Sequence, residues 1–258
     1  SKTYSTTIGG KELTAEFTDW ANQANGSVLV RLGNSTVLAT AVMGSKESNL
    51  DYFPLSVEYE EKFYAAGAIL GSRFMRREGR PSDEAILSGR MVDRTIRPLF
   101  PKGLKRDVQV IITVLSIEDL DTDVLAINAA SLALGVSDIP WGGPASAVRI
   151  GLEEGSDSFL VNPTYAQRDE SGDPRAMMDL LACGKDRLIN MVEVGAQEVS
   201  EETLGEALMR ASEEIEKLQV WQKQIVADVG KKKQVVVAPE VTPEIVALFE
   251  KTTAPRLA

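Results

Sequence analysis

The sequence predicts an α+β domain from three observations: its turn signals, its helical periodicity and the order in which they occur. Short segments rich in Val, Leu and Thr fill the first part of the chain, separated by the dipeptides Gly9-Gly10, Asn25-Gly26 and Gly33-Asn34. Such dipeptides form tight turns between antiparallel strands, so we expect a meander here. Helical periodicity appears only later, and strands followed by helices are typical of this class.

The elements can be placed along the chain from periodicity and from turn residues. Strands are expected at 11–17, 27–32, 35–43, 55–59, 107–117, 147–150, 159–161, 176–183 and 188–194. Three helices are expected: from Ser82 to Pro98, from Asp123 to Gly135, and from Glu201 to Val229. The apolar seam of the third helix is interrupted by Gln222.

The first helix carries a start signal and two distinct faces. Ser82 is a candidate N-cap, and Asp83 and Glu84 place negative charge in the first turn, where the helix dipole favours it. The apolar stripe, at spacings of three and four, consists of Ala85, Gly89, Val92, Ile96 and Leu99. A different face holds Arg90, Arg94 and Arg97, spaced i, i+4, i+7.

Composition along the chain predicts its domain organisation. Residues 1–230 are expected to form one core domain and 231–240 a linker that starts with three lysines, and a further helix is expected within 241–258. Thr242 as N-cap followed by Pro243 is a helix start signal. No apolar run of about 18 residues and no secretory signal is visible, so we expect a cytoplasmic protein without a membrane partner.

Histidine is absent and cysteine occurs once, as Cys183. Ser-His-Asp and Cys-His catalysis, the H-E-x-x-H zinc site and a structural zinc site are therefore excluded within this chain. Cys183 lies in an apolar run and is interpreted as a small buried hydrophobe.

Charge is distributed unevenly along the chain. The net charge is −10, but the window from Arg73 to Arg106 holds ten basic and four acidic residues, which gives +6 and leaves −16 for the rest. A local basic patch on an acidic body is the electrostatic footprint of a site for a polyanion.

The basic window predicts a site for single-stranded RNA, because arginine forks bind phosphates and an aromatic side chain beside them can stack a base. The candidate RNA-binding residues are Phe74, Arg76, Arg77, Arg80, Arg90, Arg94 and Arg97. The alternative is a solvated basic helix in which Asp93 pairs with Arg90 or Arg97. Residue types alone leave both interpretations open.

A resemblance to a known family extends this interpretation. Residues 74–101, FMRREGRPSDEAILSGRMVDRTIRPLFP, resemble the signature of the first core domain of bacterial polynucleotide phosphorylases, with Met75 where that family usually has a second aromatic. GNSTVL at 33–38 and DIPWGGP at 138–144 support the likeness, which covers about residues 3–225. The resemblance also implies that 241–258 are the beginning of the family's small all-helical domain, which starts near Val241.

The resemblance implies an RNase PH-like fold that is repeated twice in each subunit, with three subunits in a ring. Single-stranded RNA would thread the central pore of this homotrimer, and other RNA-degradation proteins would be further partners. Arg76 and Arg77 match the paired arginines of a loop that projects into the pore, and Phe74 matches its leading aromatic.

The same resemblance places the chemistry in a second repeat that residues 1–258 do not contain. Inorganic phosphate is the expected co-substrate there, assisted by Mg²⁺, and the product is a nucleoside diphosphate. No catalytic residue and no metal ligand is therefore expected within this chain.

Two sets of aspartates bear on whether this repeat could itself be catalytic. Asp119, Asp121 and Asp123 precede the second helix, where active repeats bind phosphate, and carboxylates at that position would occupy the site and repel the anion. Helix capping is the role expected of them. A calcium loop is excluded because its sixth position would be Val124 and its twelfth Ala130.

The second acidic group lies where active repeats carry metal-binding or acid–base aspartates, and Asp179 is its best-placed member. The other members are Asp169 and Asp173. Two interpretations of these aspartates stay open: a remnant of a former catalytic site, or ordinary surface charge.

Two functions follow. The first is part of a phosphorolytic 3′→5′ exoribonuclease, contributing RNA binding and trimer assembly. The second is a stand-alone, inactive RNase PH-like ring subunit that holds RNA for another enzyme.

Overall fold

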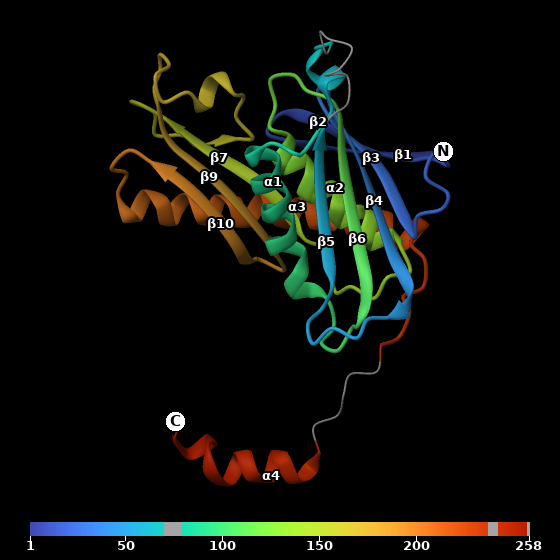
Figure 1. The fold of residues 1–258 in the computed structure, drawn as a ribbon. Coiled ribbons are helices and arrows are strands. Elements are labelled where there is room, and N and C mark those ends of the chain that lie inside the picture. Colours follow the sequence, from blue (N-terminus) through green and yellow to red (C-terminus); the bar gives the residue numbers. More distant parts are fainter. Residues whose placement is uncertain (70–78, 237–241, 257–258) are drawn as a thin grey trace.

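The computed structural model describes residues 1–69, 79–236 and 242–256. Its body consists of two β-sheets with helices packed between and beside them, which confirms the expected α+β class (Figure 1).

The larger sheet has six strands in the order β1-β2-β3-β4-β6-β5. The strands are β1 (Lys2–Ile8), β2 (Lys11–Phe17), β3 (Gly26–Leu32), β4 (Ser35–Glu47), β5 (Leu55–Glu61) and β6 (Arg106–Ser116). β1 to β4 form the antiparallel meander that the turn dipeptides predict, and Gly9 and Gly10 adopt φ values of 56° and 74° in its first turn. The sequence pattern does not predict β1, because only Ile8 at its end is buried.

β5 departs from the expected meander. It lies at the outer edge of the sheet and pairs parallel with β6, with Val57 opposite Val110. The chain between these strands contains α1 (Asp83–Ile96), and a connection through a helix brings the next strand back parallel. The strand expected at 55–59 is thus confirmed, and it lies outside the antiparallel meander.

The smaller sheet is antiparallel throughout and has the order β10-β9-β7-β8. Its strands are β7 (Ser146–Glu153), β8 (Leu160–Val161), β9 (Ala176–Lys185) and β10 (Leu188–Ala196). All four overlap ranges expected from the sequence.

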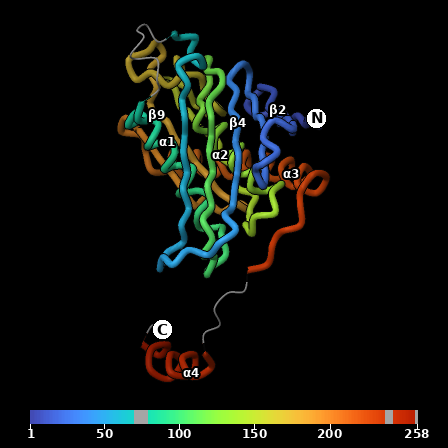
Figure 2. The backbone as a smooth tube through the Cα atoms, turned by 45° about the vertical axis from the view of Figure 1, so that its right-hand side comes forward, coloured from blue at the N-terminus to red at the C-terminus, as the bar shows by residue number. Residues whose placement is uncertain are grey.

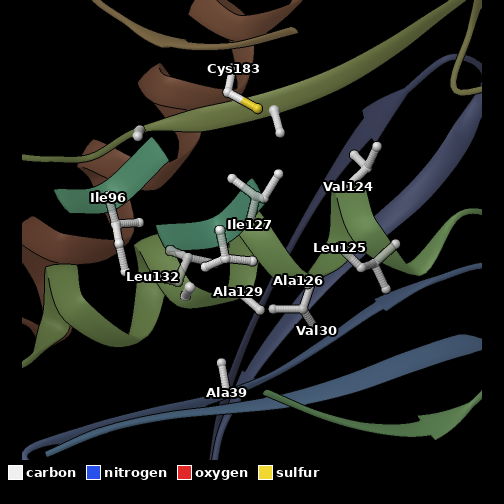
Figure 3. Packing of buried hydrophobic residues seen from close by; sticks show 14 of the residues in the cluster. Val30, Ala39, Ile96, Val124, Leu125, Ala126, Ile127, Ala129, Leu132 and Cys183 are labelled. Atoms are coloured by element: carbon white, nitrogen blue, oxygen red, sulfur yellow. The ribbon is translucent and has the colours of Figure 1, made fainter. Parts of the chain in front are cut away.

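The helix α2 (Thr122–Val136) is the centre of the core. Every residue from Val124 to Val136 is buried, because β3 and β4 pack on one side of the helix and β7, α1 and α3 (Glu201–Val229) on others. Figure 3 shows α2 between Ala39 of β4 and Cys183 of β9. The backbones approach closely, since a Cβ at Gly26 would lie 2.1 Å from the carbonyl oxygen of Ala133.

Each of these three helices begins at a side chain that caps it. Ser82 accepts a hydrogen bond from the backbone N–H of Ala85 at 3.1 Å, which confirms the predicted N-cap of α1. Asp121 caps α2 by accepting from Asp123 N–H at 2.9 Å, and Ser200 does the same for α3. Figure 1 and Figure 2 show α1 over the β5 end of the larger sheet.

The chain after α3 lies on the body before it reaches the C-terminal helix. Lys231 N–H donates to Val136 O at 2.9 Å and Gln234 N–H to Asp138 O at 2.8 Å. The ammonium group of Lys233 donates to the carbonyls of Leu134 and Ser137, so it caps the C-terminal end of α2. The first half of the expected linker is thus bound to the core domain, while the domain division at 231–240 stays a prediction.

The C-terminal helix α4 (Pro243–Thr252) starts where Thr242 and Pro243 predict a helix, although Thr242 makes no side-chain capping bond. Ile245, Val246, Leu248 and Phe249 of this helix are exposed. Within the described ranges, none of the helices combines the length and apolar character that a membrane crossing requires.

Gln222 explains the interruption in the apolar seam of α3. The side chain is fully buried, and its amide donates to Asn128 Oδ1, Ala145 O and Ser146 Oγ at 3.0–3.2 Å. Its carbonyl oxygen accepts from Ser131 Oγ at 2.6 Å. Gln222 therefore joins α3 to α2 and to the start of β7.

We predict that Gln222→Leu lowers the free energy of unfolding by about 2–3 kcal/mol, because it leaves several buried polar groups without partners. Urea unfolding of residues 1–258 measures this change. Val220→Gln, at an exposed position on the same helix, is the control and should stay within about 0.5 kcal/mol of wild type. A Gln222→Leu variant as stable as wild type would show that the network is not needed.

Candidate functional site

A groove runs between β5 and α1 on the side of the molecule that carries the predicted arginine face. Its volume is about 1180 Å³, and Arg80, Arg90 and Arg97 are among the residues that line it. Carboxylates line it too: Glu58, Glu60, Glu61, Glu84 and Asp93. The groove therefore has mixed charge.

The structure separates the predicted RNA-binding residues into three groups. Phe74, Arg76 and Arg77 lie outside the described residues. Arg80, Arg90 and Arg94 are exposed, and none of their side chains makes a hydrogen bond or ion pair with another residue in the described part of the chain. These three guanidinium groups are open to an external anion.

Arg97 forms the third group, because the fold already uses its guanidinium. Nε and Nη2 donate to the two carboxylate oxygens of Asp93 at 2.9 and 2.7 Å. Nη1 donates to Phe53 O and Nη2 to Leu55 O, both at 3.2 Å. Asp93 thus pairs with Arg97 and not with Arg90. For the solvated basic helix, the sequence leaves both of these pairings open.

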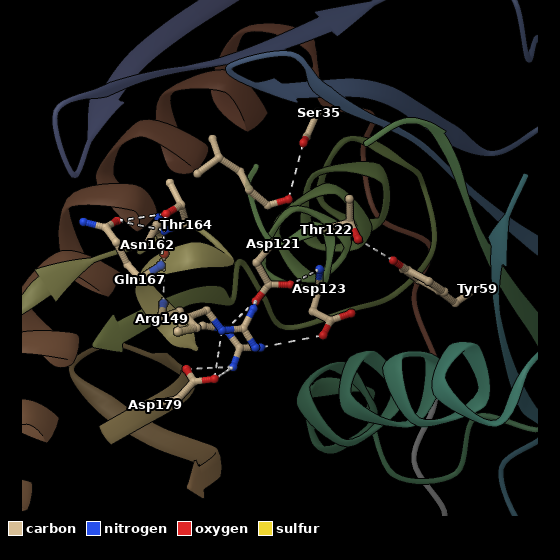
Figure 4. Close-up of polar contacts among 12 residues, drawn as sticks. Ser35, Tyr59, Asp121, Thr122, Asp123, Arg149, Asn162, Thr164, Gln167 and Asp179 are labelled. Atoms are coloured by element: carbon tan, nitrogen blue, oxygen red, sulfur yellow. Dashed lines mark hydrogen bonds and ion pairs between the residues drawn. The ribbon is translucent and has the colours of Figure 1, made fainter. Parts of the chain in front are cut away.

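A second polar site lies at the first turn of α2, over the smaller sheet (Figure 4). Arg149 of β7 is buried there, with 8% of its side chain exposed, and its Nε donates to the Asp121 carboxylate. Its Nη1 donates to both carboxylate oxygens of Asp179 at 3.0 and 2.9 Å, and its Nη2 lies 3.6 Å from Asp123.

Arg168 completes this site, which we call the α2 cluster: Asp121, Asp123, Arg149, Arg168 and Asp179. Its Nε donates to Asp179 at 2.9 Å, and its Nη1 lies 3.4 Å from Asp121. Two guanidinium groups thus face three carboxylates. The two arginines are not among the residues predicted from the sequence, although an arginine between Val148 and Ile150 in an apolar strand is a signal of a buried ion pair.

Burial and neighbouring charge set the protonation of the cluster. Burial lowers the pKa of Arg149, but the carboxylates of Asp121 and Asp179 outweigh this and leave its pKa raised, so it is charged. Burial, and then the charge of Asp121, raise the pKa of Asp123 to about 6. The hydroxyl of Tyr59, from β5, lies 2.7 Å from Thr122 Oγ1 beside the cluster, and burial raises the pKa of Tyr59 as well.

The cluster limits the chemistry that the first turn of α2 can support. A cavity of about 430 Å³ opens over it, lined by Ser88, Asp123, Arg149, Arg168 and Asp179 among others. The N-terminus of α2 is a natural position for phosphate, but the Asp121 carboxylate occupies it as the N-cap. Capping is therefore confirmed for Asp121.

Asp179 is the best-placed candidate for a metal-binding or acid–base aspartate, and two arginines hold its carboxylate. Asp169 is exposed and closes a turn by accepting from Ser171 N–H at 2.8 Å. Over the three described ranges, no group of three or more His, Cys, Asp or Glu residues is arranged to hold a metal ion.

The fold and this site define the class of protein. Residues 9–140 match the 3′ exoribonuclease family, domain 1, and the chain belongs to this family. It also matches the fold of rice (Oryza sativa) Rrp46 with a TM-score of 0.63 at 17% identity, covering 87% of this chain and 94% of that one.

Curated relatives are more similar in sequence. The polyribonucleotide nucleotidyltransferase of Exiguobacterium sibiricum is 48% identical over 233 residues, which cover 90% of this chain and 30% of the relative. That of Lysinibacillus sphaericus is 47% identical over 247 residues, covering 95% of this chain and 34% of the relative. The chain thus spans about a third of the length of these relatives.

Asp123 makes the stability of the domain depend on pH. Because its folded pKa of about 6 exceeds the unfolded value, it contributes stability below about pH 4 that is lost as the pH rises through about 6. We predict that wild type gains about 1 kcal/mol relative to Asp123→Asn when the pH falls from 7 to 5. Urea unfolding at both pH values measures this difference.

Asp157→Asn, which changes an exposed acid outside the cluster, is the control for the pH experiment. A difference between wild type and Asp123→Asn that stays constant from pH 7 to 5 would show that Asp123 keeps one protonation state throughout.

Proposed function

We propose that this chain is the part of a phosphorolytic 3′→5′ exoribonuclease that binds single-stranded RNA and contributes to assembly. In the reaction, an oxygen of inorganic phosphate attacks the phosphorus of the terminal phosphodiester. The bond from that phosphorus to the 3′ oxygen of the preceding nucleotide breaks. A nucleoside diphosphate leaves, and the shortened RNA regains its 3′ hydroxyl.

The observation that carries the proposal is the division of arginines between the two sites. In the α2 cluster both guanidinium groups are neutralised by carboxylates of the same chain, so this repeat lacks an open phosphate site. On α1, by contrast, Arg90 and Arg94 are exposed and unpaired among the described residues. The first arrangement argues against catalysis here, and the second supports binding of a polyanion.

Catalysis is assigned to a second core domain, together with Mg²⁺, which would neutralise charge on the phosphoryl group being transferred. The curated relatives, about three times the length of this chain, have room for such a domain. A homotrimeric ring, a cytoplasmic location and association with other RNA-degradation proteins follow from the family resemblance and belong to the same proposal.

The second candidate is a stand-alone, inactive ring subunit that holds RNA for another enzyme. The closed α2 cluster is compatible with it, since this candidate also needs RNA binding without catalysis. Phosphate-dependent activity of the full-length protein separates the two.

We predict that the full-length protein releases ADP from poly(A) in proportion to added phosphate, and that residues 1–258 alone release none. Chromatography of the nucleotide products measures both. Release of ADP by the segment alone would show that the α2 cluster is not a barrier, and absence of release by the full-length protein would favour the stand-alone subunit.

The RNA-binding part of the proposal has its own test. Arg90→Ala combined with Arg94→Ala should weaken binding of a single-stranded oligoadenylate by the full-length protein. Each lost phosphate contact should reduce the log–log salt slope by about 0.7. Arg31→Ala, which removes an exposed arginine of β3, is the control and should leave affinity and slope unchanged. Equal affinities for the double variant and wild type would remove α1 from the RNA site.

A further inference from the structure

Arg97 shares the arginine face of α1 but differs from Arg90 and Arg94 in what it contacts. Four of its five N–H groups are directed at acceptors within the fold: two at Asp93, one at Phe53 O and one at Leu55 O. Arginine recognises a phosphate best through two parallel N–H groups. In Arg97 the Nε and Nη2 pair that would do this is bound to the carboxylate of Asp93.

The partners of Arg97 connect three parts of the chain. Phe53 and Leu55 lead into β5, and the guanidinium also lies over the Phe53 ring, 5.8 Å from its centroid. Phe53 packs against Phe100 at 4.8 Å between ring centroids, and Phe100 packs against Trp141 at 6.4 Å. The indole N–H of Trp141 donates to Ile96 O at 3.0 Å, which returns to the end of α1.

A shift of α1 on β5 would therefore be resisted at its C-terminal end by Arg97 and by these rings. Along the helix α1 lies in contact with β5, since a Cβ at Gly89 would make an ordinary van der Waals contact with Val57 O at 3.6 Å. Arg90 follows Gly89 directly, so its position depends on how α1 is held against the sheet edge.

We propose that Arg97 is a positioning residue for RNA binding and not a phosphate ligand. Arg97 binds Asp93 on α1 and the carbonyl oxygens of Phe53, just before β5, and Leu55, at its start. These contacts fix α1 on the edge strand and thereby hold Arg90 and Arg94 in place. This revises the role that the sequence predicts for Arg97, and it rests on the proposed RNA-binding function.

Asp93→Ala distinguishes the two roles by the sign of its effect. If Arg97 were a phosphate ligand, removing Asp93 would free its fork and delete a nearby negative charge, so RNA would bind more tightly and with a steeper salt slope. As a positioning residue, Arg97 loses its anchor. Binding of a fluorescent oligoadenylate by the full-length protein should then weaken on the order of tenfold, as charged hydrogen bonds of this kind allow.

Substitutions of Arg97 itself complete the test. Arg97→Ala should weaken RNA binding but leave the salt slope at its wild-type value, whereas Arg90→Ala should lower the slope by about 0.7. Arg97→Lys keeps the charge but lacks the fork, so it should not restore affinity. In phosphorolysis, KM for long RNA should rise while kcat is retained, which a general loss of folded protein would not produce.

Hydrogen–deuterium exchange of the full-length protein, in the absence of RNA, reports how firmly Arg97 holds α1 against β5. Peptides that cover residues 53–59 should exchange faster in Arg97→Ala and Asp93→Ala but not in Arg90→Ala. The matched control is Arg210→Ala on α3, which removes an i,i+4 pair with Glu214. The Arg210 side chain is 41% exposed against 40% for Arg97. This control should change neither exchange at 53–59 nor RNA binding.

Tighter RNA binding by Asp93→Ala, full rescue by Arg97→Lys, or unchanged exchange at 53–59 would each overturn the positioning role. Failure of the wild-type protein to bind RNA would overturn the proposed function and this role together. This outcome is distinguishable from failure of the positioning role alone, because in that case wild type binds RNA and the Asp93→Ala variant binds RNA more tightly.

Discussion

The buried guanidinium of Arg149 is the interaction on which the arrangement of α2 and the smaller sheet depends. It lies on β7 and reaches the first turn of α2 through Asp121 and the neighbouring strand through Asp179. A buried cation is tolerated only when carboxylates replace its hydration, and removal of one member of such a set costs about 3–5 kcal/mol. The ion pairs of Arg149 with Asp121 and Asp179 therefore join the helix to the sheet, and loss of either carboxylate would weaken this connection.

This constraint also closes the site chemically. The partial positive charge at the start of α2 and both guanidinium groups are satisfied from within the chain, so an incoming phosphate would have to displace a carboxylate that is covalently held in place. The first turn of α2, a position that favours an anion, is thus occupied by a structural carboxylate. The exposed arginines on α1 face no such competition at their own positions, which is why we place the polyanion there.

The sequence correctly predicts features whose signals are local. It does not predict contacts between residues that are far apart in the chain. Ser82, the turn at Gly9-Gly10 and the ranges of the three helices of the body depend on a few neighbouring residues each, and the structure confirms them. Arg149 and Asp179 are 30 residues apart, and their pairing depends on the register of β7 against β9. The parallel pairing of β5 likewise depends on a crossover, which no dipeptide encodes.

If RNA binds as we propose, the surroundings of the α1 face limit how many phosphates it can contact. The groove beside it is lined by five carboxylates and four basic side chains, and one of these, Arg97, is bound to Asp93. The carboxylates are Glu58, Glu60, Glu61, Glu84 and Asp93, and the basic residues are Lys62, Arg80, Arg90 and Arg97. An RNA backbone would approach most readily where guanidinium groups extend beyond these acids, so we expect this face to contact few phosphates. Under the proposed function, processive degradation would need more contacts than Arg90 and Arg94 supply. We propose that Arg76 and Arg77, which precede α1 in the same window of positive charge, contribute such contacts.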